Sequence, residues 1–200
     1  MRLEHEQKSG AILVDFIPSV SLTWIVAMIL RKTKVMALSG KSTDKLVFAL
    51  LYACVIALAS WGGIRLINYS LDSKFYRDFL LKWDISIRNY SREIGDWPIF
   101  TGSNHLKYME KLTKALKGSS FPAPKSNTNR SFIYRMNKIG STDEQLFLLC
   151  FANRIIVYGM SKETFERVDN FVDGKISAEK GFFTGYPSKD KKTYIGLLKL

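Results

Sequence analysis

The sequence predicts an α+β protein in which a long N-terminal helix packs on a small antiparallel sheet. Three observations predict this class. Residues 46–64 form an uncharged apolar run, and an amphipathic helical stripe continues from it to Ile94. Beyond residue 130, apolar and polar side chains alternate as they do in half-buried strands. We therefore expect the first half of one helix to span a membrane and its second half to pack on a sheet.

The apolar run is long enough to cross a bilayer, because about 20 helical residues span its hydrocarbon core. The first charge after its start is Arg65. We assign residues 46–67 to a transmembrane helix, with residues 1–45 as a cytoplasmic or leader segment. Residues 68–200 are then a single extracytoplasmic domain.

The amphipathic half of the helix is marked by large apolar side chains at steps of four, four, four, three and four residues. We expect this stripe to pack against the C-terminal part of the chain, and its members are Phe75, Phe79, Trp83, Ile87, Tyr90 and Ile94. Gly95 and the Trp97–Pro98 pair are expected to end the helix.

The segment before the span allows three interpretations. Residues 11–30 are mostly apolar but contain Asp15 and Pro18, and an acid at the centre of a membrane helix costs about 2.5 to 3.5 kcal/mol. The segment is a weak first membrane helix, a signal-like leader, or an extension translated in error before Met36. We favour the last, since a start at Met36 leaves a short charged lead before a good span.

Basic residues between the two apolar runs predict the orientation. The single acid there is Asp44, against Arg31, Lys32, Lys34, Lys41 and Lys45. Positively charged flanks stay in the cytoplasm. We therefore expect a single-pass protein of the inner (cytoplasmic) membrane whose C-terminal domain is periplasmic or otherwise extracytoplasmic.

The domain is expected to hold two short helices and several strands. A helix follows Asn104 and ends at Gly118, with an apolar face of Leu106, Met109, Leu112 and Leu116. The other expected elements are a strand over 131–138, a hairpin of 146–151 with 155–158 or, as the alternative, one bent strand, a helix over 162–171 capped by Ser161, a polar loop over 174–192 and a strand over 193–199.

The residues that usually carry catalysis are scarce. The two histidines are His5 and His105, and the two cysteines are Cys54 in the span and Cys150 in an apolar run. Phosphate-binding glycine loops, Gly-x-Ser-x-Gly elbows and zinc-spaced cysteines do not occur in the sequence. We expect Cys150 to be a core residue, and we expect no enzymatic activity and no obligatory cofactor.

Two non-catalytic sites are candidates. Asp169 and Asp173 share a helix face, with Glu179 in the loop that follows, and clustered carboxylates are typical Ca²⁺ ligands. Solvated acids at a helix end are the alternative. The second candidate is a basic patch of Lys189, Lys191 and Lys192, flanked by Tyr186 and Tyr194, which would suit phosphate or an acidic partner.

Two segments resemble a known family. Ile87-Arg88-Asn89-Tyr90-Ser91-Arg92-Glu93-Ile94-Gly95-Asp96-Trp97-Pro98 resembles the end of the long helix in type IV pilins and type II secretion pseudopilins, where an aromatic, a glycine and an aromatic-Pro pair follow one another. Val168-Asp169-Asn170-Phe171-Val172-Asp173-Gly174, with Gly181 downstream, is similar to a segment near the end of many pilin-like domains. The resemblance covers most of residues 41–200. It implies a pilin-like fold, partners that are other pilin-like subunits or secretion components, and in some pseudopilins a calcium ion in the C-terminal loop.

The leader departs from that family. A prepilin leader ends in glycine, followed by an aromatic residue or Met, with Glu at the fifth mature position. The resemblance makes Gly40 the processing point, but Lys41-Ser42-Thr43-Asp44-Lys45 follow it, so that Lys45 takes the place of the acid. This departure predicts a tip or minor subunit, or a protein that does not polymerise.

We therefore expect a membrane-anchored pilin-like or pseudopilin-like subunit of a filament or secretion assembly. Two alternatives stay open: a non-polymerising membrane-tethered binding or sensory domain, and a DNA-uptake minor pilin that uses its basic surface. The net charge of +12 suits an anionic partner. Because that charge is spread along the chain, it does not select nucleic acid over lipid or an acidic protein.

Overall fold

The computed structural model describes residues 40–94 and 96–200, with side chains from residue 43. The chain divides into two units, Met1–Val55 and Ile56–Leu200. In the first unit, the described part is the beginning of helix α2 (Gly40–Lys74), whose side chains from Thr43 to Val55 are exposed. The three interpretations of residues 11–30, and the charges that predict the orientation, lie largely outside the described residues.

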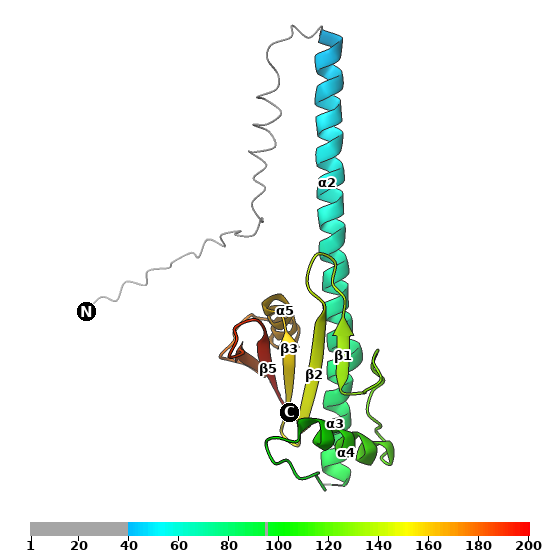
Figure 1. The fold of residues 1–200 in the computed structure, drawn as a ribbon, viewed down its shortest axis with the longest axis vertical. Helices are drawn as coiled ribbons and strands as arrows, with labels where there is room; N and C mark the ends of the chain where they lie inside the picture. The colour runs from blue at the N-terminus through cyan, green and yellow to red at the C-terminus, as the bar shows by residue number, and fades with distance from the viewer. Residues whose placement is uncertain (1–39, 95) are drawn as a thin grey trace, which may run out of the picture. The chain divides into compact units, whose positions relative to one another are not determined.

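In the second unit, α2 passes directly into a π-helical segment, η1 (Phe75–Leu80), and then into α3 (Leu81–Glu93) (Figure 1). Within the described residues, the helix Thr43–Glu93 is long and apolar enough to cross a membrane. Its most apolar stretch is exposed throughout. On length and composition, this helix fits a single membrane span.

The π-helical segment keeps the apolar stripe on one side of the helix. Residues four apart in an α-helix advance by more than one turn, so each step rotates the stripe by about 40°. A π-helix has a wider turn, which cancels this drift across the steps from Phe75 to Trp83. The six large side chains buried on this side of η1 and α3 are Phe75, Phe79, Leu80, Trp83, Ile87 and Tyr90.

The assignment of Ile94 to this packing stripe is wrong. The helix ends at Glu93, and Ile94 is the residue that follows its last turn. Its side chain is 49% exposed. The stripe therefore ends at Tyr90, whose hydroxyl donates a hydrogen bond to the carbonyl of Asp96 at 2.7 Å.

The sheet has five antiparallel strands in the order β1-β2-β3-β5-β4. Their bounds are Ile133–Met136 (β1), Glu144–Phe151 (β2), Arg154–Met160 (β3), Phe183–Pro187 (β4) and Tyr194–Lys199 (β5). The predicted central hairpin is β2 with β3. The prediction of a loop over all of 174–192 is wrong, because β4 lies within it. Glycine and proline occur in this strand, and both weaken the sequence signal for a strand.

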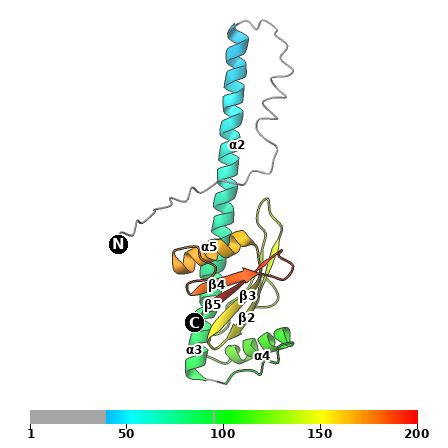
Figure 2. The ribbon, with the colours of Figure 1, turned by 90° about the vertical axis from the view of Figure 1, so that its left-hand side faces the viewer.

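The two short helices are α4 (His105–Lys117) and α5 (Lys162–Asp173), which lie beside opposite ends of the sheet (Figures 1 and 2). Ser161 caps α5 as predicted and accepts the Thr164 N–H at 3.1 Å. In α4 the prediction for Leu106 is wrong, since its side chain is 45% exposed. Leu106 lies about a quarter turn from the centre of the buried face, which Tyr108 completes instead.

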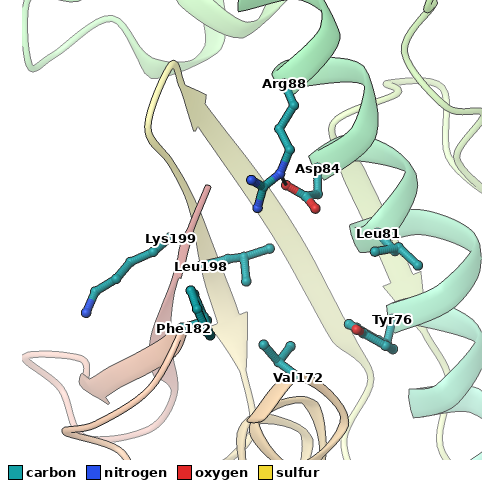
Figure 3. Close-up of a pocket in the computed structure, with 8 residues that line it drawn as sticks. All are labelled: Tyr76, Leu81, Asp84, Arg88, Val172, Phe182, Leu198 and Lys199. Atoms are coloured by element: carbon teal, nitrogen blue, oxygen red, sulfur yellow. Dashed lines mark hydrogen bonds and ion pairs between the residues drawn. The ribbon is translucent and has the colours of Figure 1, made fainter.

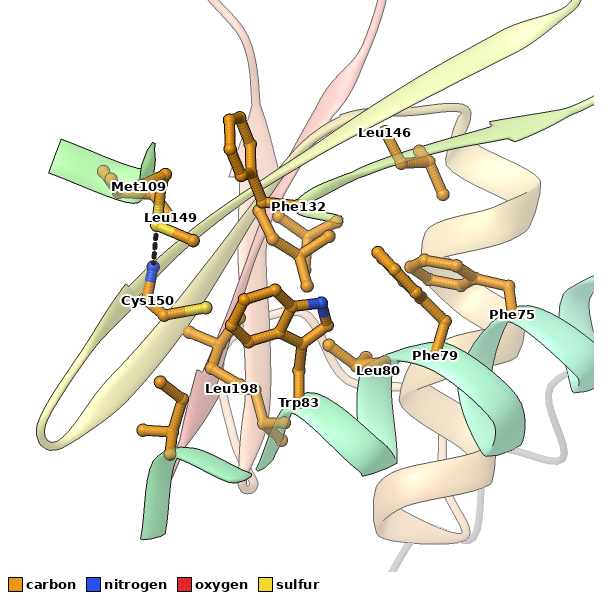
Figure 4. Close-up of a cluster of buried hydrophobic side chains, with 14 of the residues drawn as sticks. Phe75, Phe79, Leu80, Trp83, Met109, Phe132, Leu146, Leu149, Cys150 and Leu198 are labelled. Carbon is orange, nitrogen blue, oxygen red and sulfur yellow. Dashed lines mark hydrogen bonds between the residues drawn. The ribbon is translucent and has the colours of Figure 1, made fainter. Parts of the chain in front are cut away.

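One cluster of buried side chains joins the helices to the sheet. Figure 4 shows Trp83 near its centre, with Phe79 and Leu80 from the long helix and Phe132 and Leu149 opposite. The Trp83 indole N–H donates to the carbonyl of Ser131 at 3.1 Å. The long helix is therefore the inner spine of the domain, as its stripe predicts.

Candidate functional site

A group of polar side chains, all buried except the partly exposed Arg167, ties the long helix to the sheet and to α5. We call it the junction cluster, and its members are Asp72, Lys138, Glu144, Thr164 and Arg167. Lys138 Nζ lies 2.7 Å from Asp72 Oδ1 and 3.3 Å from Glu144 Oε1, and it donates to Thr164 Oγ1 at 2.5 Å. The ammonium group thus lies among three oxygens, and the Thr164 hydroxyl accepts its hydrogen bond.

The second cation completes the cluster. Arg167 Nη1 lies 2.6 Å from Asp72 Oδ2, and its other nitrogen pairs with Glu163 at the surface. The Thr164 hydroxyl lies 2.8 Å from Glu144, which also accepts the Ser161 N–H at 3.0 Å. Two acids therefore balance two bases inside the protein. Since buried charges are costly unless paired and hydrogen-bonded, these partners specify how α2, β2 and α5 meet.

Sequence reasoning missed the junction cluster because its members come from distant parts of the chain. The one local signal was Asp72, which lies three residues before Phe75 and is completely buried. A carboxylate on the apolar side of a helix indicates a buried cation, but only the fold shows that the cation is Lys138.

The two aspartates at the other end of α5 bind the loop that follows it. Asp169 Oδ2 accepts the Ser177 N–H at 2.5 Å, while the two oxygens of Asp173 accept the N–H groups of Phe182 and Phe183 at 2.9 Å each. Gly181 lies against Asp173, and a Cβ there would come within 2.3 Å of the carboxylate.

Burial raises the pKa of the Asp169 carboxyl; the charge and hydrogen bond of Asp173 add to this rise, while the Ser177 N–H opposes it. The third predicted calcium ligand, Glu179, is exposed. Within the described residues, no group of three His, Cys, Asp or Glu side chains is placed to hold a metal ion. The structure thus brings Asp169 and Asp173 together but does not add Glu179 to them as a third carboxylate.

The outer edge of β4 is closed by groups from the preceding segment. The Phe183 N–H is bound by Asp173, and the Gly185 N–H donates to the carbonyl of Ala178 at 2.9 Å. Pro187 has no N–H. This edge therefore lacks the row of free donors that would pair with a strand of another chain.

The outer edge of β1 is closed by side chains. Asn127 accepts the Arg135 N–H at 2.9 Å and donates to the Arg135 carbonyl at 2.6 Å, as a neighbouring strand would. The Thr128 hydroxyl donates to the carbonyl of Ile133 at 2.8 Å, and the Ile133 N–H donates to Arg130. The outer edges of β4 and β1 are thus both occupied by hydrogen bonds within the chain, and addition of a strand from another chain is disfavoured at each edge.

The side of α3 that faces away from the core carries apolar residues. Leu81 is 37% exposed and Ile85 is 46% exposed. Leu81 lines a groove of about 260 Å³ beside the helix (Figure 3), together with Tyr76, Asp84, Arg88, Val172, Phe182, Leu198 and Lys199. Arg88 and Asp84 pair at 2.6 Å on the helix side of this groove.

The three lysines of the predicted basic patch lie on the turn between β4 and β5, and all are exposed. Lys191 has a left-handed backbone with φ of 57°, and Asp190 accepts the Lys192 N–H at 3.2 Å. Tyr194 stacks on Phe165 with ring centroids 5.3 Å apart. The turn brings the lysines together, but Tyr194 belongs to the core packing.

Cys150 is a fully buried core residue, and burial raises the pKa of its thiol well above the ordinary value. The Tyr108 hydroxyl donates to the Cys150 carbonyl at 2.9 Å. The pKa of Tyr108 is raised to about 12, mainly by burial, so this hydroxyl keeps its proton and remains a donor at neutral pH. The His105 ring packs on Phe100 with centroids 5.2 Å apart.

Comparison of the chain with protein-family models, curated proteins and solved structures finds no match. The fold and site define an α+β protein with a five-stranded antiparallel sheet and, within residues 40–94 and 96–200, one candidate membrane span. The resemblance to pilins therefore rests on the two sequence segments quoted above.

Proposed function

We propose that the chain is a membrane-anchored, pilin-like subunit that associates through the outer side of its long helix. The observation that carries this proposal is the exposure of Leu81 and Ile85 on a helix whose opposite side, with Trp83 and Ile87, is fully buried. Leu81 and Ile85 lie one turn apart and form a small apolar surface among the exposed charged residues Arg77, Lys82 and Arg88. The domain covers one side and leaves the other for a partner.

The closed sheet edges support the same proposal. Asp173 and Ala178 occupy the donors of β4, and Asn127 occupies the groups of β1. Association by strand addition would have to break these hydrogen bonds first. The groove beside Leu81 needs no such rearrangement, and Val172 and Leu198 give it apolar walls.

A membrane span favours association between copies. Anchored chains share one orientation and one plane, which raises the concentration of each helix near its neighbours. Helices that cross the membrane side by side therefore meet along the same faces. A tethered domain that does not polymerise would use this surface for a different partner.

Disulfide cross-linking in membranes tests the proposal. We expect Ile85→Cys, in the full chain carrying Cys54→Ser, to form cross-linked dimers on mild oxidation. Cys150 is buried and needs no replacement. Lys111→Cys is the matched control, because it is also exposed but lies on α4.

A second substitution makes the test specific. Leu81 lies one turn from Ile85 on the same side of the helix. The substitution Leu81→Asn should lower the yield of the Ile85→Cys dimer without changing the thermal unfolding temperature. Equal cross-linking at residues 85 and 111 would contradict association through this side and favour the tethered binding domain.

A further inference from the structure

The turn between β1 and β2, residues 137–143, is hydrogen-bonded to the long helix at Asn68. Asn68 Nδ2 donates to the Ile139 carbonyl at 3.0 Å, and the Ile139 N–H donates to Asn68 Oδ1 at 3.0 Å. The preceding residue, Lys138, pairs with Asp72 one turn further along the helix. These contacts hold the turn beside residues 68–72 of α2.

The length of the apolar run gives the depth of Asn68 in a bilayer. Twenty helical residues counted from Leu46 span the hydrocarbon core of about 30 Å and end at Arg65. Asn68 is three residues further, or about 4.5 Å. The headgroup layer on each side of the core is roughly 5 to 7 Å thick. Asn68, and the turn bonded to it, therefore lie at the depth of the headgroups.

Aromatic residues lie on both sides of the level of Arg65, Trp61 four residues before it and Tyr69 four residues after it. Trp61 is 57% exposed and Tyr69 is 50% exposed, and these residue types gather where the hydrocarbon core meets water. Arg65 lies between them, with its guanidinium carbon 4.3 Å from the centre of the Trp61 ring.

The turn itself suits a lipid surface. Ile139 is an apolar residue that is 46% exposed, in a turn whose next residues are glycine, serine and threonine. The exposed acid of the turn, Asp143, is neutralised by its pair with Arg135 at 2.7 Å. An exposed apolar side chain whose charged neighbours are paired suits the bilayer surface, where apolar side chains enter between the headgroups.

We propose that this turn is a membrane contact, with Ile139 inserted into the headgroup layer of the leaflet through which α2 leaves the bilayer. The proposal rests on the membrane anchoring in the proposed function but not on association between copies. Its consequence is that the domain touches the bilayer at a second point beside its own helix. Two contacts restrict rotation and tilt, which one helix alone would leave free.

Fluorescence quenching by nitroxide lipids tests this contact. The full chain with Cys54→Ser is labelled at Ile139→Cys with a polarity-sensitive dye and placed in phosphatidylcholine–phosphatidylglycerol vesicles at no more than one chain per vesicle. This dilution removes neighbouring copies as an alternative cause. A nitroxide on the lipid headgroup should quench the label at residue 139 several-fold more than a label at Lys111→Cys, on α4 at the other end of the sheet.

A third label separates this proposal from the anchoring on which it rests. Leu58→Cys lies within the span and should be quenched by a nitroxide on the acyl chain. Quenching at residue 58 with equal quenching at 139 and 111 would overturn the turn contact and leave the anchor intact. Without quenching at residue 58, the anchor and the turn contact would both be overturned.

The role of Asn68 has its own test. Asn68→Ala removes both hydrogen bonds to Ile139 and should lower the quenching at residue 139 towards the level at residue 111. Unchanged quenching would overturn the conclusion that Asn68 sets the depth of the turn.

Discussion

The two ends of α5 bury carboxylates under opposite conditions. At the start of the helix, Asp72 and Glu144 face Lys138 and Arg167 in the junction cluster. At its end, Asp169 and Asp173 bind backbone N–H groups instead. Within the described residues, Asp72 Oδ1 and Asp169 Oδ1 both lack a hydrogen-bond partner, but Asp72 Oδ1 lies 2.7 Å from the Lys138 ammonium group, whereas Asp169 forms no ion pair there.

The two sets of carboxylates stabilise different parts of the fold. The junction cluster joins three elements that are far apart in the sequence, and its charges balance. The aspartate pair orders only the loop that follows its own helix. It also places negative charge at a helix C-terminus, where the helix dipole disfavours it. We therefore expect opposite effects on stability when the charge of Lys138 and the charge of Asp169 are removed.

The largest effect is expected for Lys138→Met, which leaves two buried carboxylates without their shared cation. Such a loss costs about 3 to 5 kcal/mol of unfolding free energy. The control is Arg135→Met, whose pair with Asp143 is exposed on both sides and whose loss should cost about 1 kcal/mol or less. Chemical denaturation of the full chain in detergent, followed by tryptophan fluorescence, measures both.

A double variant shows whether charge is the cause. Asp72→Leu combined with Lys138→Met removes one acid with the base, so it should be less destabilised than Lys138→Met alone. If the losses of the two single variants simply add, Lys138 does not act through Asp72.

An intermediate effect is expected for Asp173→Ala, which frees the N–H groups of Phe182 and Phe183. Phe183 is buried, so its N–H left without a partner costs about 1 to 3 kcal/mol, whereas the N–H of the exposed Phe182 can bind water instead. Hydrogen exchange should therefore quicken at residues 182–185, while the central strands β2 and β3 stay protected. Asn170→Ala, an exposed change on the same helix, should leave this exchange unaltered.

The smallest effect, and one of opposite sign, is expected for Asp169→Asn. The pKa of Asp169 is raised by burial first and by Asp173 second. The folded protein thus holds this proton more tightly than the unfolded chain, so the stability from this group is lost as pH rises through the raised pKa. Asparagine does not titrate and can still accept the Ser177 N–H.

Asp169→Asn should therefore stabilise the protein by roughly 1 kcal/mol or less at neutral pH. The gain should shrink as the pH falls below the ordinary carboxyl range. Thermal unfolding at several pH values measures it. A variant that is less stable at pH 7 than at pH 4, relative to the parent, would show that Asp169 is needed as a carboxylate.

The sequence predicted elements whose signals are local. Steps of three and four residues marked the long helix, Ser161 marked the start of α5, and alternating side chains marked the central hairpin. Strand β4 was missed because its order depends on Asp173 and on pairing with β5. The junction cluster was missed because no local pattern connects Asp72 with Lys138.

The spacing of residues in the stripe also indicates the π-helical segment. Three large residues separated by steps of four, from Phe75 to Trp83, cannot stay in line on an ideal α-helix. The wider turn of the π-helical segment keeps these three residues on one side of the helix. Its presence could be inferred from the sequence only by assuming that all these residues face one core.

The π-helical segment also fixes the rotational phase between α2 and α3. Removing one residue from 75–80 would turn every side chain on one side of the deletion by about 100° relative to those on the other. Asp72 would then leave Lys138, or Trp83 would leave the core. A change of length in these six residues is therefore penalised more than most substitutions within them, because it breaks contacts on one side of the deletion or on the other.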